Sequence, residues 1–155
     1  MASRILLCML CVALLVKSEG VAAQTEPQSN YGAFVKKQQS LAAYAHDFID
    51  FSKSDEYEPS SDLGQAANES GEYANAAGSL LEVYDSLSCP ADRAVARAVI
   101  ARDFAFYSKQ LKNQITGVNA GIAYTKKPGV AAEAIRMRDE IRELEGLFDS
   151  TKLAP

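Results

Sequence analysis

The side chains of this chain that could do chemistry are few, and Cys89 and His46 are the first pair to consider. A cysteine hydrolase needs a thiolate beside a base such as imidazole. Cys89 precedes Pro90, a residue that favours the first position of a helix, and a helix N-terminus can activate a thiol. His46 is the only histidine, and it falls about 15 residues into an expected helix, which places it roughly 20 Å from Cys89. We therefore expect neither a Cys–His dyad nor a Ser–His–Asp triad.

His46 and Met137 form the one pair that could hold a cofactor. Histidine and methionine can bind haem non-covalently between helices, whereas the motif for covalent haem, Cys-x-x-Cys-His, is absent. His46 lies eight residues before the end of its expected helix and Met137 eight residues after the start of the last one. The two residues should therefore be level in a bundle. The alternative, which we favour, is that Met137 fills the core and His46 points to water, so no cofactor is expected.

Three further features concern metals and modification. One cysteine and one histidine beyond the leader do not make a zinc site, and the acidic stretch 47–62 lacks the pattern of a calcium loop; no metal site is expected. Cys89, as an odd thiol in an exported protein, is a candidate for an intermolecular disulfide and hence for a homodimer. Asn68 begins the glycosylation sequon Asn-Glu-Ser, which has meaning only in a eukaryotic host.

Residues 1–23 have the pattern of a cleavable secretory signal peptide. Arg4 provides a positive start, an apolar run follows over 5–16, and 21–23 are small residues of the kind that precede a cleavage site. The apolar run is too short to span a bilayer, which takes roughly 20 residues. We expect a secreted or periplasmic protein, in which Cys8 and Cys11 are lost with the leader and no internal disulfide is possible.

The composition of the remaining 132 residues excludes several partners. It contains 19 acidic and 14 basic residues, and an acidic balance argues against nucleic acid or an anionic membrane as the main partner. No second apolar segment is long enough for membrane insertion after cleavage. Few glycines and prolines together with many alanines favour helices over strands.

The apolar residues then predict four helices, at about 31–54, 61–87, 90–124 and 129–150, after a flexible segment over 24–30. Each helix carries a stripe of apolar residues at steps of three and four, and Ser61 is the expected N-cap of the second. The short turns predict an all-α domain over 31–153, an antiparallel up-down-up-down four-helix bundle. It should be elongated, because the third helix would be about 50 Å long. The expected buried side of the third helix consists of Val95, Val99, Ile100, Phe104, Tyr107, Leu111, Ile115, Val118 and Ile122.

Two patterns should set how the helices pack. Gly64, Gly71 and Gly78 recur every seven residues in the second helix, at a cost of about 1 kcal/mol each relative to alanine. Close packing of a neighbouring helix of the same chain is the favoured cause, and a groove for an outside partner is the alternative. Three arginines of the third helix are expected to face four acids of the fourth. These residues are Arg93, Arg97 and Arg102, and Asp139, Glu140, Glu143 and Glu145.

The functional expectation follows from the scarcity of chemically reactive side chains. The chain resembles no family closely enough to name one, and the side chains for catalysis or metal binding are largely missing. We therefore expect a non-enzymatic helical bundle that binds another protein, as an inhibitor, an immunity-type protein or an effector does. The competing class is a carrier of non-covalent haem or a small ligand that uses His46 and Met137.

Overall fold

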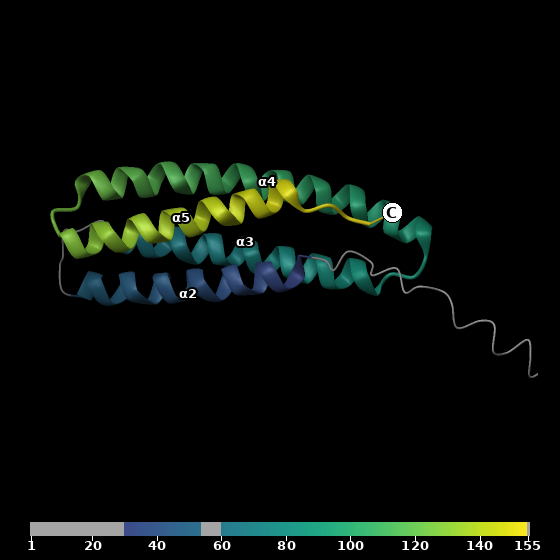
Figure 1. Ribbon diagram of the computed structural model, residues 1–155, viewed down its shortest axis with the longest axis horizontal. Helices are drawn as coiled ribbons and strands as arrows, with labels where there is room; N and C mark the ends of the chain where they lie inside the picture. The colour runs from purple at the N-terminus through teal and green to yellow at the C-terminus, as the bar shows by residue number, and fades with distance from the viewer. Residues whose placement is uncertain (1–29, 54–59, 155) are drawn as a thin grey trace, which may run out of the picture.

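The structure is a computed structural model that describes residues 30–53 and 60–154. These residues form four α-helices and no strand: α2 (Tyr31–Lys53), α3 (Ser60–Ser86), α4 (Pro90–Tyr124) and α5 (Pro128–Ser150). Figure 1 shows the helices side by side as a bundle, which confirms the expected all-α four-helix fold. The expected signal peptide over 1–23 lies outside the described residues, as does the flexible segment over 24–30 except for Asn30.

The helix starts follow from proline and backbone geometry. Cys89 precedes α4 with an extended backbone and Pro90 stands at the first helical position, as expected. Lys127 and Pro128 repeat this arrangement, so α5 begins one residue before the expected Gly129. The expectation for Ser61 is wrong, because α3 already includes Ser60 and Ser61 therefore lies inside the helix.

The core is built from the predicted stripes of α2, α3 and α5. Part of it is a cluster of three phenylalanine rings contributed by three helices. The ring centroid of Phe34 in α2 lies 5.7 Å from that of Phe104 in α4 and 4.9 Å from that of Phe148 in α5. Phe104 and Phe148 pack edge to face at 5.0 Å, a favoured aromatic geometry. Other wholly buried side chains extend this core along the bundle: Leu41, Leu81, Leu111, Met137, Ile141 and Leu144.

The heptad glycines of α3 face α2, the helix with which α3 packs most extensively. A Cβ atom on Gly64 would lie 3.3 Å from the Cβ of Phe48, and one on Gly71 would lie 3.6 Å from the Cβ of Leu41. A Cβ atom on Gly78 would lie 3.6 Å from the ring of Tyr31. The glycines therefore allow the close approach of α2 and α3 within the chain, which is the favoured cause.

Helix α4 departs from the expected pattern at its N-terminal half. Ile100, Phe104, Leu111 and Val118 are buried as predicted, and Tyr107, Ile115 and Ile122 are partly buried against the core. Val95 and Val99 were expected inside, but they are 67% and 39% exposed. The reason is that α4 carries apolar residues on more than one side. A stripe chosen by spacing alone therefore mixes the side that meets the core with the side that does not.

The expected pairing between the arginines of α4 and the acids of α5 is also wrong. Arg97 donates to the carbonyl oxygen of Ala154 at 2.8 Å, Arg93 donates to that of Leu87 at 2.6 Å, and Arg102 pairs with its neighbour Asp103 at 2.9 Å. The acids of α5 find other partners: Lys37 of α2 pairs with Glu140 and Glu143, Lys112 pairs with Glu145, and Asp139 pairs with arginines of its own helix.

Lys37 is the charged link between α2 and α5. Its ammonium is 2.7 Å from Glu140 and also contacts Glu143. Burial by itself would lower the pKa of Lys37, but the hydrogen bonds and charges of the two carboxylates outweigh it, so the pKa is raised.

Among the described helices, none has a stretch that is long and apolar enough to cross a bilayer.

Candidate functional site

His46 and Met137 lie in different environments. The side chain of His46 on α2 is 75% exposed, and its Nδ1 atom is 3.6 Å from the carboxylate of Asp50. Met137 on α5 is wholly buried in the core. An imidazole in solvent and a thioether inside the core do not form a shared ligand site in this arrangement. Binding of haem or a small ligand between them stays a prediction that the structure does not favour.

Cys89 is exposed and free in the turn between α3 and α4. Its carbonyl oxygen accepts the N–H of Arg93 at 3.0 Å, and its side chain makes no capping hydrogen bond with the helix. The imidazole of His46 is on α2 beside Asp50 and is not part of this turn. The thiol is accessible for the expected intermolecular disulfide, and a homodimer stays a prediction.

Asn68 lies on the exposed side of α3, where its Nδ2 donates to Glu72 at 3.0 Å. It borders a shallow hollow of about 150 Å³ between α2 and α3, together with Gln38 and Asn75. Glycosylation of Asn68 stays a prediction. Within residues 30–53 and 60–154, no group of three or more His, Cys, Asp or Glu side chains is arranged to hold a metal ion. Part of the acidic stretch, 54–59, lies outside these ranges.

The most unusual surface is on α4. Val95, Val99 and Phe106 are 67%, 39% and 53% exposed, and we call these three residues the outer face of α4. A helix advances about 100° per residue, so the three side chains lie within roughly 40° of one another. They point away from the buried side of the same helix, which carries Phe104 and Leu111. The outer face of α4 therefore carries three apolar side chains on one side of the helix in contact with solvent.

The ring of Phe106 contacts that of its neighbour in sequence, Tyr107. Its centroid lies 5.9 Å from that of Tyr107, at an interplanar angle of 65°. Tyr107 in turn stacks on Tyr73 of α3 at 5.3 Å and contacts Phe148 of the core at 5.6 Å. A chain of aromatic contacts thus leads from the core to the surface at Phe106.

A polar residue interrupts the outer face of α4. Arg102 falls between Val99 and Phe106 on the same side of the helix, and its guanidinium is largely exposed while it pairs with Asp103. Apolar anchors bordered by charged groups are the usual composition of a protein interface. These side chains offer apolar contact and one positive charge.

The apolar spacing predicted that Val95 and Val99 are buried, and it gave no prediction for Phe106. The signal was present, because α4 carries apolar residues on more than one side while α2, α3 and α5 have a single stripe. Apolar residues outside the stripe that faces the core are candidates for exposure. Comparison of this chain with protein-family models, with curated proteins and with solved structures gives no match, so the assignment of the outer face of α4 rests on its own geometry.

Proposed function

We propose that this protein is an exported, non-enzymatic helical bundle that binds another protein through the outer face of α4. The observation that carries the proposal is the exposed Phe106, which makes an edge contact with Tyr107 and lies on the same side of α4 as Val99. Binding energy at protein interfaces concentrates in a few anchored side chains, and aromatic residues are enriched among them. An inhibitor, an immunity-type protein and an effector all act by such binding.

The scaffold suited to this role is an elongated antiparallel bundle with up-down-up-down connections. Contacts between helix ends support it: Gly64 at the start of α3 is near Phe48 at the end of α2, and Gly78 near the end of α3 is beside Tyr31 at the start of α2. Phe34 at the start of α2 packs on Phe148 at the end of α5. A bundle of this kind presents α4 as a rigid rod, and a rigid binding face loses little freedom on association.

Export is the first testable part of the proposal. It is supported by the signal-peptide pattern of residues 1–23, which ends in small residues before Gln24. Expressed in its own host, the protein is expected in the extracellular or periplasmic fraction, with Gln24 as the first residue on N-terminal sequencing. A chain that stays in the cytoplasm and still begins at Met1 would contradict this part.

Binding through the outer face of α4 is tested with a charge placed on its anchor. Phe106→Lys should weaken binding of the partner by at least about 30-fold, because loss of an anchoring aromatic residue typically costs 2 kcal/mol or more. The matched control is Ile49→Lys, because Ile49 is equally exposed, at 53%, but lies on α2. Surface substitutions of this kind usually change stability by no more than about 0.5 kcal/mol, so both variants should fold.

The measurement uses the unaltered protein and both variants as bait in the extracellular or periplasmic extract of the host. Mass spectrometry identifies the captured proteins, and titration calorimetry with the purified candidate then gives the dissociation constants. The proposal predicts one partner that binds the unaltered protein and Ile49→Lys alike and is lost with Phe106→Lys. Equal binding to all three baits would show that any partner uses another surface.

A further inference from the structure

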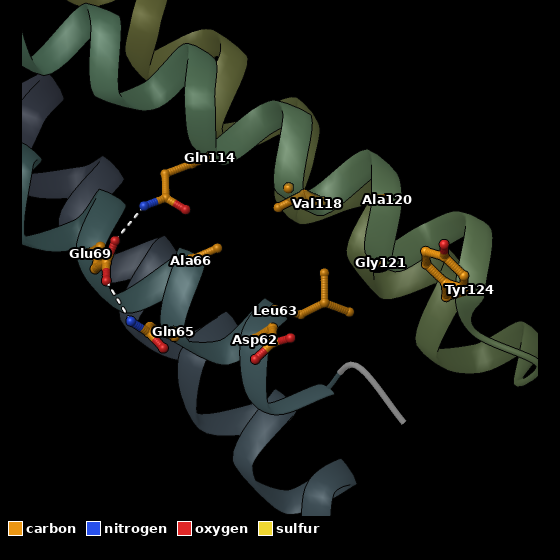
Figure 2. Close-up of a pocket in the computed structure, with 11 residues that line it drawn as sticks. Asp62, Leu63, Gln65, Ala66, Glu69, Gln114, Val118, Ala120, Gly121 and Tyr124 are labelled. Atoms are coloured by element: carbon orange, nitrogen blue, oxygen red, sulfur yellow. Dashed lines mark hydrogen bonds between the residues drawn. The ribbon is translucent and has the colours of Figure 1, made fainter. Parts of the chain in front are cut away.

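A hollow of about 420 Å³ is lined by residues of α3 and of the C-terminal part of α4, which follows the outer face of α4 along the helix. Figure 2 shows its lining, in which Leu63 and Ala66 come from α3 and Val118 and Gly121 from α4. Cavities that bind small molecules in proteins have volumes of about 300–1,000 Å³, a mostly apolar lining and a few polar groups. We call this hollow the α3–α4 groove. Its polar lining residues are Asp62, Gln65, Glu69, Gln114 and Tyr124.

The groove is open because small residues stand where larger ones would fill it. Ala66, Gly117, Ala120 and Gly121 contribute little or no side chain to the space between the two helices. The helices still touch at one point, since a Cβ atom on Gly121 would come within 2.9 Å of Leu63. Leu63 therefore fills the space beside Gly121, and the groove extends on either side of this contact.

Gly117 has no packing reason to be glycine. The glycines at 64, 71, 78 and 121 each face a neighbouring side chain, whereas a Cβ atom on Gly117 would meet nothing within 4 Å. Glycine inside a helix costs about 1 kcal/mol relative to alanine, and here that cost has no compensating contact within the chain. Gly146 in α5 also faces open space, but it does not line the groove and so provides a matched control.

The charges of the groove are all of one sign. Its eleven lining residues include two carboxylates, Asp62 and Glu69, and no lysine, arginine or histidine. Glu69 is already engaged, because one carboxylate oxygen accepts from Gln65 at 2.7 Å and the other accepts from Gln114 across the groove. Asp62 makes no hydrogen bond or ion pair with the described residues. Tyr124, which is 79% exposed, adds an aromatic ring.

We propose that the α3–α4 groove binds a small organic cation with an apolar body, such as an arylalkylamine. The apolar body would lie on Leu63, Ala66 and Val118, which offer surface but no hydrogen bonds. The ammonium would be attracted by the Asp62 carboxylate and by the ring of Tyr124, since aromatic faces attract cations. A carboxylate ligand of the same shape is disfavoured by both carboxylates. This site is independent of the outer face of α4, because the two share no residue.

The test is a nuclear magnetic resonance titration of ¹⁵N-labelled protein with three probes of one shape. These are 4-phenylbutylamine, the neutral 4-phenylbutanol and the anionic 4-phenylbutyrate. The amine is expected to shift the amide signals of Gly117, Val118 and Gly121 and to bind more tightly than the alcohol. The butyrate is expected to bind most weakly. No shift with the amine, or equal shifts with the amine and the butyrate, would overturn the proposal.

Two substitutions separate the groove from the rest of the surface. Gly117→Leu fills the open space and should weaken binding of the amine at least tenfold, whereas Gly146→Leu makes the same change away from the groove and should leave it unchanged. Asp62→Asn should weaken the amine by about fivefold or less, because an exposed ion pair contributes roughly 0–1 kcal/mol, and should leave the alcohol unaffected. Retention of amine binding by a folded Gly117→Leu variant would also overturn the proposal. None of these results bears on capture of a protein through Phe106.

Discussion

Phe34→Ala is expected to lower the free energy of unfolding by about 3–5 kcal/mol, the range found when buried phenylalanines are truncated. Phe34 is wholly buried, and its ring contacts Phe104 of α4 and Phe148 of α5. The substitution therefore opens a cavity where three helices meet, and rigid helices collapse into such a cavity only in part. Because domains are stable by only about 5–15 kcal/mol, this variant should lie near the limit of folding.

Urea unfolding followed by circular dichroism measures the effect. Phe106→Ala is the control, because it removes the same atoms from a residue that is 53% exposed, and it should cost less than about 1 kcal/mol. The slope of the unfolding free energy against urea should be similar in both variants if they retain the native fold. A loss of less than about 1 kcal/mol for Phe34→Ala would mean that the three-ring cluster is not a packed part of the core.

Gly71→Leu is expected to destabilise the protein by about 3 kcal/mol, at the upper end of the range for overpacking. A Cβ atom on Gly71 would lie 3.6 Å from the Cβ of Leu41 and 3.7 Å from the carbonyl oxygen of Gln38. These are ordinary contacts for a single carbon. The branched end of a leucine would have to press α2 and α3 apart along their most extensive contact or turn outward into the shallow hollow that Gly71 borders, which would reduce the loss.

The size of the added side chain is the decisive variable. Gly71→Ala should be neutral or stabilising by up to about 1 kcal/mol, because alanine favours the helix and its Cβ fits. Gly146→Leu should also cause no loss, since a Cβ atom there would meet nothing within 4 Å. Thermal unfolding of the three variants gives their order. If Gly71→Leu proves as stable as Gly71→Ala, the close approach of α2 and α3 is wrong.

The glycine pattern shows how far periodicity can be interpreted without a structure. Gly64, Gly71 and Gly78 share a heptad position, which identified a close approach but not its partner. Only the packing of the chain shows that α2 takes that place. The same holds for the charges. Long side chains such as Arg97 reach whichever acceptor their rotamers allow, and the carbonyl of Ala154, which Arg97 meets, has no signal in the sequence.

The candidate sites illustrate the same limit. Residue counts directed attention to His46, Met137 and Cys89, because these side chains are scarce and chemically distinctive. The surfaces that the structure offers instead involve Phe106 and Gly117, which are common residues. Their significance depends on exposure and on neighbouring helices, and neither property is local. Phe106 contacts Tyr107, whose ring packs toward the core, and Gly121 packs against Leu63 of α3.

The sequence by itself determined the four helices and the buried stripes of α2, α3 and α5, because one-sided apolar spacing leaves a helix a single face to bury. Tertiary structure decided how far the buried side of α4 extends. The pattern of α4 correctly predicted Ile100, Phe104 and Leu111 inside, but it also favoured Val95 and Val99, which lie on another side of the helix. The phenylalanine cluster on α2 and α5 selects Phe104 for the interior, and this choice leaves Val95, Val99 and Phe106 in water.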